Sequence, residues 1–288
     1  MDPSFNYELA FSRNIGWLTI DEQAKLRGCR IAIAGLGGVG GSHLLTLCRL
    51  GVENFNIADF DSFELQNFNR QVGATVSSLG KPKAATLEHL ALDINPNAKI
   101  QVFPEGVTPE NLNTFLDNVD VYVDSVDFFA VETRRMLFAE CHLRGIPALT
   151  AAPLGMGVGF LYFEPGKMSF EEYFRLEGQS RQEQLARFIA GLAPKILHRS
   201  YLVFPEAVNF SEQRGPSTGM ACDLCAGLTG VQVLKILLKR GKVRAAPHGM
   251  QFDAYREKLS YSWRPFGNAN PFQKILIYFI RSQLDGGK

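Results

Sequence analysis

The chain has 288 residues, of which 46% are apolar and 20% are charged, as in ordinary folded globular proteins. Its formal net charge of +1 provides no field of one sign that would attract DNA or an acidic membrane surface. No basic-then-apolar signal opens the sequence, and the longest strongly apolar stretch, Ile275 to Ile280, is much shorter than the roughly 20 residues of a membrane helix. With scattered cysteines expected as reduced thiols, these features predict a cytoplasmic protein without a DNA or membrane partner.

The first 150 residues alternate between β-branched runs and helical segments. Such alternation predicts βαβ units, hence an α/β fold with a Rossmann-like, mostly parallel sheet and helices on both faces. We expect strands at 30–34, 55–58, 99–103, 119–123 and 146–151, and helices at 6–27 (two short ones, the second opened by a Thr19–Glu22 capping box), 39–50, 82–94, 108–116 and 129–144.

The pattern changes after Pro153. Residues 155–163 alternate small and large side chains, which predicts an added antiparallel strand. The closing helix is apolar on all sides, so we expect it to be buried. The other expected elements are a helical segment at 169–199, a loop at 205–219, a helix at 224–239, a hairpin of 251–255 with 259–263, and the closing helix at 271–284.

A glycine-rich loop follows the first expected strand and precedes a helix. Its glycines are Gly35, Gly37, Gly38 and Gly40 in the string GLGGVG. Glycines let the backbone approach phosphate oxygens, and the helix N-terminus supplies unpaired N–H groups. Asp59, at the end of the second strand, could accept ribose hydroxyls. Alone, these residues predict a nucleotide site and are compatible with NAD.

Four further sequence motifs favour ATP over NAD as the bound nucleotide. FSRN, DFDSFELQNFNRQVG, SSLGKPKAATLEHL and VDSVD, together with the glycine loop, closely resemble the ThiF/MoeB/HesA superfamily, which is related to ubiquitin-activating enzymes. The resemblance covers roughly residues 7–155. It implies ATP as cofactor and a single adenylation domain, 1–288, comprising N-terminal helices (1–28), a nucleotide-binding core (29–155), a crossover region (156–218) and a C-terminal helix, hairpin and closing helix (219–288).

The resemblance also implies roles for individual residues. Asp59 would hold the ribose, with Asp61 and Asn67 as polar partners, and Arg70 and Lys83 would be the phosphate cations. Adenylation requires such cations and a carboxylate-held Mg²⁺, because negative charge builds on the α-phosphate and pyrophosphate. The remaining implied site residues are Asp127, as Mg²⁺ ligand, and Arg13, which would enter the partner subunit's ATP site in a homodimer.

One position departs from the family pattern. The Mg²⁺ aspartate is usually followed by asparagine, whereas Phe128 and Phe129 follow Asp127 here. The nearby Asp124 could share or replace the role of Asp127, although such a residue more often caps the end of a strand.

The predicted function is ATP- and Mg²⁺-dependent activation of a carboxylate, most simply the C-terminus of a ubiquitin-like protein or peptide, as acyl-AMP with release of pyrophosphate. Because no cysteine lies between positions 142 and 221, we expect the chain to lack a crossover-loop catalytic cysteine. The alternatives are the same chemistry on another carboxylate, as in tRNA-modifying relatives, an NAD-dependent oxidoreductase, or a non-catalytic nucleotide-binding scaffold.

Two groups of potential ligands remain. Cys222 and Cys225 form one C-x-x-C pair at the start of an apolar helix, which could bind zinc only with two further ligands such as His198 and His248. Thioester or redox use is a second alternative, and core packing is the favoured one, so zinc is not expected. The histidines on expected helices are interpreted as surface or satisfied residues: His43, His89 and His142.

Overall fold

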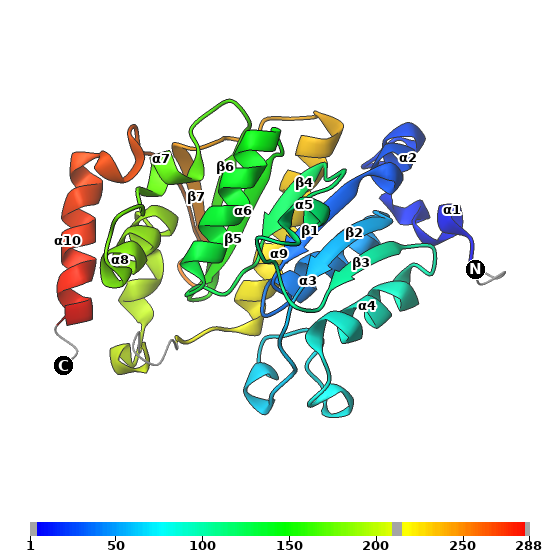
Figure 1. Cartoon of the computed structure of the whole chain (residues 1–288), viewed down its shortest axis with the longest axis horizontal. Coiled ribbons are helices and arrows are strands. Elements are labelled where there is room, and N and C mark those ends of the chain that lie inside the picture. Colours follow the sequence, from blue (N-terminus) through cyan, green and yellow to red (C-terminus); the bar gives the residue numbers. More distant parts are fainter. Residues whose placement is uncertain (1–4, 209–214, 286–288) are drawn as a thin grey trace. The chain divides into compact units, whose positions relative to one another are not determined.

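The computed structural model describes residues 5–208 and 215–285. The chain divides into two compact units. Unit 1 comprises Met1–Val126 and Ala226–Val243, and unit 2 comprises Asp127–Cys225 and Arg244–Lys288. The two units are described in turn (Figure 1).

Unit 1 contains a parallel sheet of four strands in the order β3-β2-β1-β4. Its register pairs Ile31 with Phe55 and Val121, and Phe55 with Ile100. The central strands are almost wholly buried, as expected for the sequence RIAIA. The strands are β1 (Arg30–Ala34), β2 (Asn54–Ala58), β3 (Lys99–Phe103) and β4 (Val121–Asp124).

The helices of unit 1 begin and end close to the expected positions. The Thr19–Glu22 capping box is present, with Thr19 Oγ1 accepting the Glu22 N–H at 3.1 Å. The α-helices are α1 (Tyr7–Ala10), α2 (Ile20–Gly28), α3 (Gly40–Arg49), α4 (Lys83–Ile94) and α5 (Leu112–Phe115), and the 3₁₀ helices are η1 (Ser12–Asn14), η2 (Leu65–Asn67) and η3 (Val76–Ser78).

Unit 2 contains four strands in the order β5-β6-β7-β8, each antiparallel to its neighbour. The expected antiparallel strand at 155–163 and the hairpin are thereby confirmed. The Rossmann-like α/β fold class is also confirmed, with parallel strands first and antiparallel strands in the C-terminal part (Figure 1). The strands are β5 (Ala148–Leu154), β6 (Gly157–Phe163), β7 (His248–Asp253) and β8 (Lys258–Trp263).

Aromatic rings form the core of unit 2. Phe138 stacks on Phe170 with ring centroids 4.5 Å apart, and Phe174 packs against Phe170 and Phe188. The helices that contribute to this unit are α6 (Val131–Arg144), α7 (Phe170–Phe174), α8 (Arg181–Leu192), α10 (Pro271–Asp285), and the 3₁₀ helices η4 (Leu197–Tyr201), η5 (Pro205–Ala207) and η6 (Gly267–Ala269).

Two expectations about helices need correction. The helix expected at 108–116 is only one turn, α5, because Asn111 Oδ1 and Nδ2 bond to the Thr108 N–H and the Gly106 carbonyl and hold the preceding residues as a loop. The closing helix is buried on one side only. Ile277 and Ile280 pack against Ala186 and Ala190 of α8, while the opposite side is exposed.

The helix α9 (Gly219–Leu238) begins five residues earlier than the expected 224 and carries residues of both units. By length and composition it could cross a membrane, and close to half of it is buried within the chain. A core helix of a soluble protein meets the same two criteria, so the expected absence of a membrane partner stays a prediction.

Candidate functional site

The glycine loop connects β1 to α3 in unit 1. Gly35 has φ +84°, and a Cβ there would lie 2.2 Å from the Ser125 carbonyl oxygen. A Cβ on Gly40 would lie 1.8 Å from the carbonyl oxygen of Gly35. Both positions therefore require glycine for steric reasons. By contrast, a Cβ on Gly37 would meet only Gln71 Nε2, at 3.7 Å, so this position is open and Gly37, like Gly38, is partly exposed.

The N-terminus of α3 has no side-chain cap. Its N-cap residue is Val39, whose side chain cannot accept a hydrogen bond, and the ten-residue helix begins directly after the loop. The first backbone N–H groups of a helix lack acceptors within the helix and carry its positive dipole end. The loop and helix together therefore form a site suited to phosphate.

Asp59 follows β2 and is bonded to the loop itself. Its Oδ2 accepts the Leu36 N–H at 2.6 Å, and its Oδ1 accepts the Asp61 N–H at 2.8 Å. Burial raises the pKa of Asp59 above its ordinary value, and these two backbone hydrogen bonds act in the opposite direction. Asp59 thus fixes the loop, and each oxygen retains a lone pair that could accept a ribose hydroxyl.

Lys83 and Asp61 form an ion pair, with Lys83 Nζ 2.9 Å from Asp61 Oδ2. The lysine side chain is 7% exposed, whereas the aspartate side chain is 54% exposed. The Lys83 N–H also donates to the Asp61 carbonyl at 2.9 Å, so the first turn of α4 is attached to the segment after β2. The structure therefore brings together Asp59, Asp61 and Lys83, three of the residues predicted from sequence.

Asn67 and Arg70 lie on the segment that follows. Asn67 is buried, and its Oδ1 accepts the Glu64 N–H at 2.9 Å, which orders η2. Arg70 is half-buried, and its Nη1 donates to the carbonyl of Gln66 at 2.8 Å and to Asn69 Oδ1 at 2.9 Å. Asn67 thus acts on the conformation of the segment that carries the arginine.

Two buried polar atoms beside the glycine loop have no hydrogen-bond partner in the described part of the chain. They are Gln71 Oε1 and Ser125 Oγ. Gln71 Nε2 would lie 3.7 Å from a Cβ on Gly37, and Ser125 Cβ would lie 3.0 Å from a Cβ on Gly40. Buried polar atoms are nearly always bonded, so unpaired ones at this loop fit a polar ligand. Sequence reasoning missed both, although each lies within one of the motif strings.

Asp127 is the first residue of unit 2, three positions after the end of β4. Its side chain is exposed, and its Oδ1 accepts the Phe129 N–H at 2.8 Å in the turn before α6. Asp124, the alternative carboxylate, is buried, with Oδ1 3.4 Å from the Tyr122 hydroxyl. Within residues 5–208 and 215–285, no three His, Cys, Asp or Glu side chains gather as a metal site.

The departure from the family pattern has a structural role. Phe128 packs edge-to-face on Phe129 with ring centroids 5.1 Å apart, and it also contacts Phe188 of α8 at 5.4 Å. The two rings therefore attach the turn after Asp127 to the aromatic core of unit 2, in place of the amide group that the family pattern supplies.

Arg13 lies on η1 and is exposed. Among the described residues it forms no ion pair or hydrogen bond with the glycine loop or with the Lys83–Asp61 pair. A role for Arg13 at the ATP site of a partner subunit stays a prediction.

The two cysteines of the C-x-x-C pair are both buried on α9. Burial raises the pKa of the Cys225 thiol well above its ordinary value, which disfavours the thiolate that metal binding and thioester formation need. The favoured interpretation, core packing, agrees with this burial.

Comparisons with known proteins identify relatives of this chain. The chain is 32% identical over 152 residues to tRNA threonylcarbamoyladenosine dehydratase of Haemophilus influenzae, covering 52% of this chain and 57% of the relative. It is 30% identical over 196 residues to molybdopterin-synthase adenylyltransferase of the same species, covering 66% of this chain and 79% of the relative. The chain thus spans only a little over half the length of the first of these relatives.

A solved structure, that of Escherichia coli MccB with ATP, superposes with a TM-score of 0.65 at 18% identity and covers 88% of this chain and 69% of that one, which shows the shared fold. The relatives' names support an adenylyltransferase rather than a nicotinamide oxidoreductase. The model of the ThiF family matches residues 11–272, nearly the whole length, and the chain therefore belongs to the ThiF family.

Proposed function

We propose that this protein is an ATP- and Mg²⁺-dependent adenylyltransferase that activates a carboxylate as acyl-AMP and releases pyrophosphate. The observation that carries the proposal is the uncapped N-terminus of α3 behind the glycine loop, with Asp59 bonded to that loop. When bound, ATP supplies the α-phosphate that the carboxylate attacks and the pyrophosphate that leaves. The carboxylate is already an anion at neutral pH, so the chain needs no general base.

Each site residue has a task in this proposal. The backbone N–H groups of the loop and α3 bind phosphate oxygens, and Asp59 accepts ribose hydroxyls. With ATP bound, Lys83 would exchange its partner Asp61 for phosphate oxygens, and Arg70 would assist it. Asp127 is exposed and would hold Mg²⁺, a cation that proteins usually bind through one or two carboxylates together with water and substrate phosphates.

The substrate class we propose is the C-terminus of a small protein or peptide. Relatives named molybdopterin-synthase adenylyltransferase and sulfur carrier protein ThiS adenylyltransferase support this choice. The first relative, named for a modified tRNA base, favours a second candidate in which the carboxylate belongs to a tRNA.

We further propose that the chain stops at the acyl-adenylate. No cysteine lies between positions 142 and 221, and the next two, Cys222 and Cys225, are buried with the Cys225 thiol disfavoured as a thiolate. The partner or substrate then supplies the nucleophile. A thioester that survives on this chain after incubation with ATP and substrate would contradict the proposal.

The test of the main proposal is ATP–pyrophosphate exchange with small carrier proteins, synthetic peptides and carboxylate-modified tRNA as separate substrates. We expect Mg²⁺-dependent exchange that falls by about 100-fold or more in Asp127→Ala, since the metal stabilises charge in the transition state. The control is Asp93→Ala, which removes an exposed carboxylate from α4. Tight NADH binding without ATP binding would instead favour the oxidoreductase.

A further inference from the structure

Unit 2 contains a pocket of about 400 Å³ between α8, α10 and the residue that follows α7. Pockets of this size accommodate small ligands or a few side chains of a peptide. Five charged side chains line it, four of them cationic and one acidic: Arg175, Arg187, Lys274, Arg281 and the acid Glu183.

The acid in this pocket is already neutralised. Glu183 Oε1 lies 2.7 Å from Arg187 Nε, and its Oε2 lies 3.7 Å from Arg281 Nη1. Lys274 and Arg175 are exposed and form no ion pair in the described part of the chain. The cations that line the pocket therefore outnumber its single acid by four to one.

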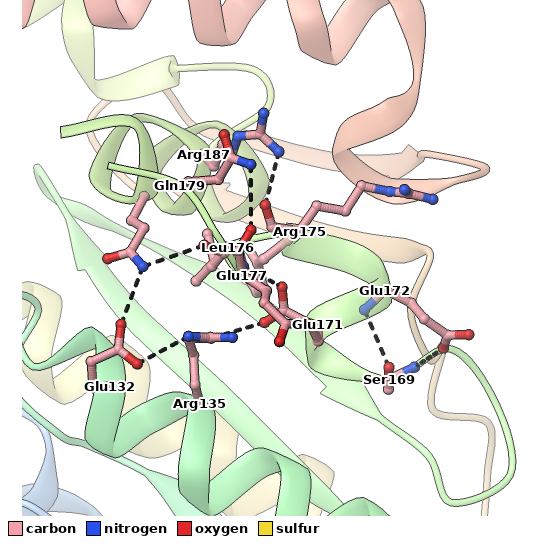
Figure 2. A network of polar contacts seen from close by, with 12 residues as sticks. Glu132, Arg135, Ser169, Glu171, Glu172, Arg175, Leu176, Glu177, Gln179 and Arg187 are labelled. Carbon is pink, nitrogen blue, oxygen red and sulfur yellow. Dashed lines mark hydrogen bonds and ion pairs between the residues drawn. The ribbon is translucent and has the colours of Figure 1, made fainter. Parts of the chain in front are cut away.

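Arg175 occupies a position where glycine is the favoured residue. It is the C-cap of α7 with φ 55° and ψ 54°, in the left-handed region. Its carbonyl accepts a hydrogen bond from Arg187 Nη1 at 2.8 Å, so its backbone is held in place. Figure 2 shows its side chain extended, with no dashed line reaching the guanidinium.

The two acidic residues closest to Arg175 on α7, Glu171 and Glu172, form hydrogen bonds or ion pairs with other residues. Glu171 accepts from Arg135 Nε at 3.0 Å and from the Glu177 N–H, and Glu172 belongs to the capping box of α7 with Ser169 (Figure 2). Neither is drawn in contact with the Arg175 guanidinium, although the positive charge of Arg175 acts on Glu172 through space.

The outer side of α10 adds apolar surface next to these cations. Phe272, Ile275 and Tyr278 recur every three residues along one side of the helix and are 75%, 68% and 69% exposed. Tyr278 also lines the pocket. A contiguous exposed apolar surface with neighbouring charge is typical of a protein-binding site.

We propose that the pocket and the outer side of α10 bind an acidic, partly apolar segment of a polypeptide partner. Its carboxylates enter the pocket, and its apolar side chains cover Phe272, Ile275 and Tyr278. A small anion would leave the apolar side uncovered, and a second copy docking through the same face would place Lys274 and Arg281 against like charges. Binding at this surface does not depend on adenylation.

The test is fluorescence anisotropy with a labelled decapeptide of alternating glutamate and leucine, added to the full chain. We expect saturable binding that weakens as salt is raised, and about tenfold or greater loss in affinity when glutamine replaces glutamate in the peptide. Arg175→Gly and Lys274→Ala should each reduce affinity by several-fold to about tenfold. Arg175→Gly suits the local backbone, so it removes the charge without disturbing the fold.

The matched controls are Lys195→Ala, an exposed lysine of unit 2 away from the pocket lining, and Arg144→Ala, which leaves the pocket intact. A double Arg175→Glu, Lys274→Glu variant should prefer a lysine–leucine peptide. Equal binding of the glutamate and glutamine peptides, equal loss in the controls, or binding of citrate or inorganic phosphate at this pocket without peptide binding would each overturn the proposal.

Discussion

At the scale of single residues, the glycines of the loop differ in whether the surrounding atoms leave room for a side chain. Gly35 and Gly40 approach backbone atoms too closely for any Cβ, whereas Gly37 has room. The motif G-x-G-x-x-G does not make this distinction, because spacing does not say which glycine faces the backbone and which faces a ligand.

We expect Gly40→Ala to destabilise the chain by about 1–3 kcal/mol, because the methyl group must displace the Gly35 carbonyl. ATP binding should fall with it, since the same shift moves the phosphate loop. Gly37→Ala is the matched control and should change stability by no more than about 0.5 kcal/mol. Urea unfolding and nucleotide binding of both variants measure the difference; equal destabilisation would contradict the steric argument.

The expectation that the histidines on helices are exposed or hydrogen-bonded is wrong for His43. It is fully buried on α3, and neither ring nitrogen has a hydrogen-bond partner among the described residues. Desolvation by burial lowers its pKa to about 3.

This burial makes stability depend on pH. Below about pH 6.5 the unfolded chain takes up a proton at His43 that the folded chain does not, so the free energy of unfolding falls as pH falls toward 3. Between these two pKa values, His43 changes the free energy of unfolding by up to about 1.4 kcal/mol per pH unit. His43→Leu should remove that contribution, while His89→Leu, at an exposed position, should not; urea titrations at pH 7, 6 and 5 compare them.

At the scale of elements, α8 and α10 show how one helix divides into a buried and an exposed side. Ile277 and Ile280 face Ala186 and Ala190, while Ile275 is 68% exposed. The composition of residues 271–284 alone predicts a helix that is apolar and buried on all sides. Only its partner helix decides which residues are core.

We expect Ile277→Ala to lower the free energy of unfolding by about 2–4 kcal/mol, as truncation of a buried aliphatic side chain leaves a cavity. Ile275→Ala deletes the same atoms from the exposed side and should cost less than about 0.5 kcal/mol. Thermal and urea unfolding of the two variants measure the contrast. Equal losses would mean that the exposed side is covered in the free protein.

At the scale of the whole molecule, the homodimer stays a prediction that a mixing experiment can test. If Arg13 acts in the partner subunit's site, Arg13→Ala and Asp127→Ala are each inactive alone but complement each other in mixed dimers. Each mixed dimer has one intact site of two, so the purified mixed dimer should show about half of the wild-type exchange activity.

Mixed dimers form only if subunits of the two variants assemble together. The two variants are therefore co-expressed with different tags, and the dimer that carries both tags is purified. Recovery of no activity in a confirmed mixed dimer would show that Arg13 acts within its own chain or not at all. A chain that sediments as a monomer at assay concentration would exclude the trans arrangement.

The sequence by itself determined the order and type of nearly every element and the position of the glycine loop. These features are local: a β-branched strand, a glycine turn and a helix follow one another within a few residues, as do Thr19 and Glu22 in their capping box. Asp59, Asp61 and Lys83 are likewise predicted as site residues from the short motif strings that contain them.

Only the tertiary structure decided how those residues are paired. Lys83 bonds to Asp61 from 22 positions away, Asp59 fixes the glycine loop through Leu36, and Gln71 and Ser125 are left as unpaired polar atoms beside it. The burial of His43, the exposed side of α10 and the cationic pocket likewise depend on which segments pack together. Such contacts depend on the path of the chain between distant segments, which composition and periodicity do not encode.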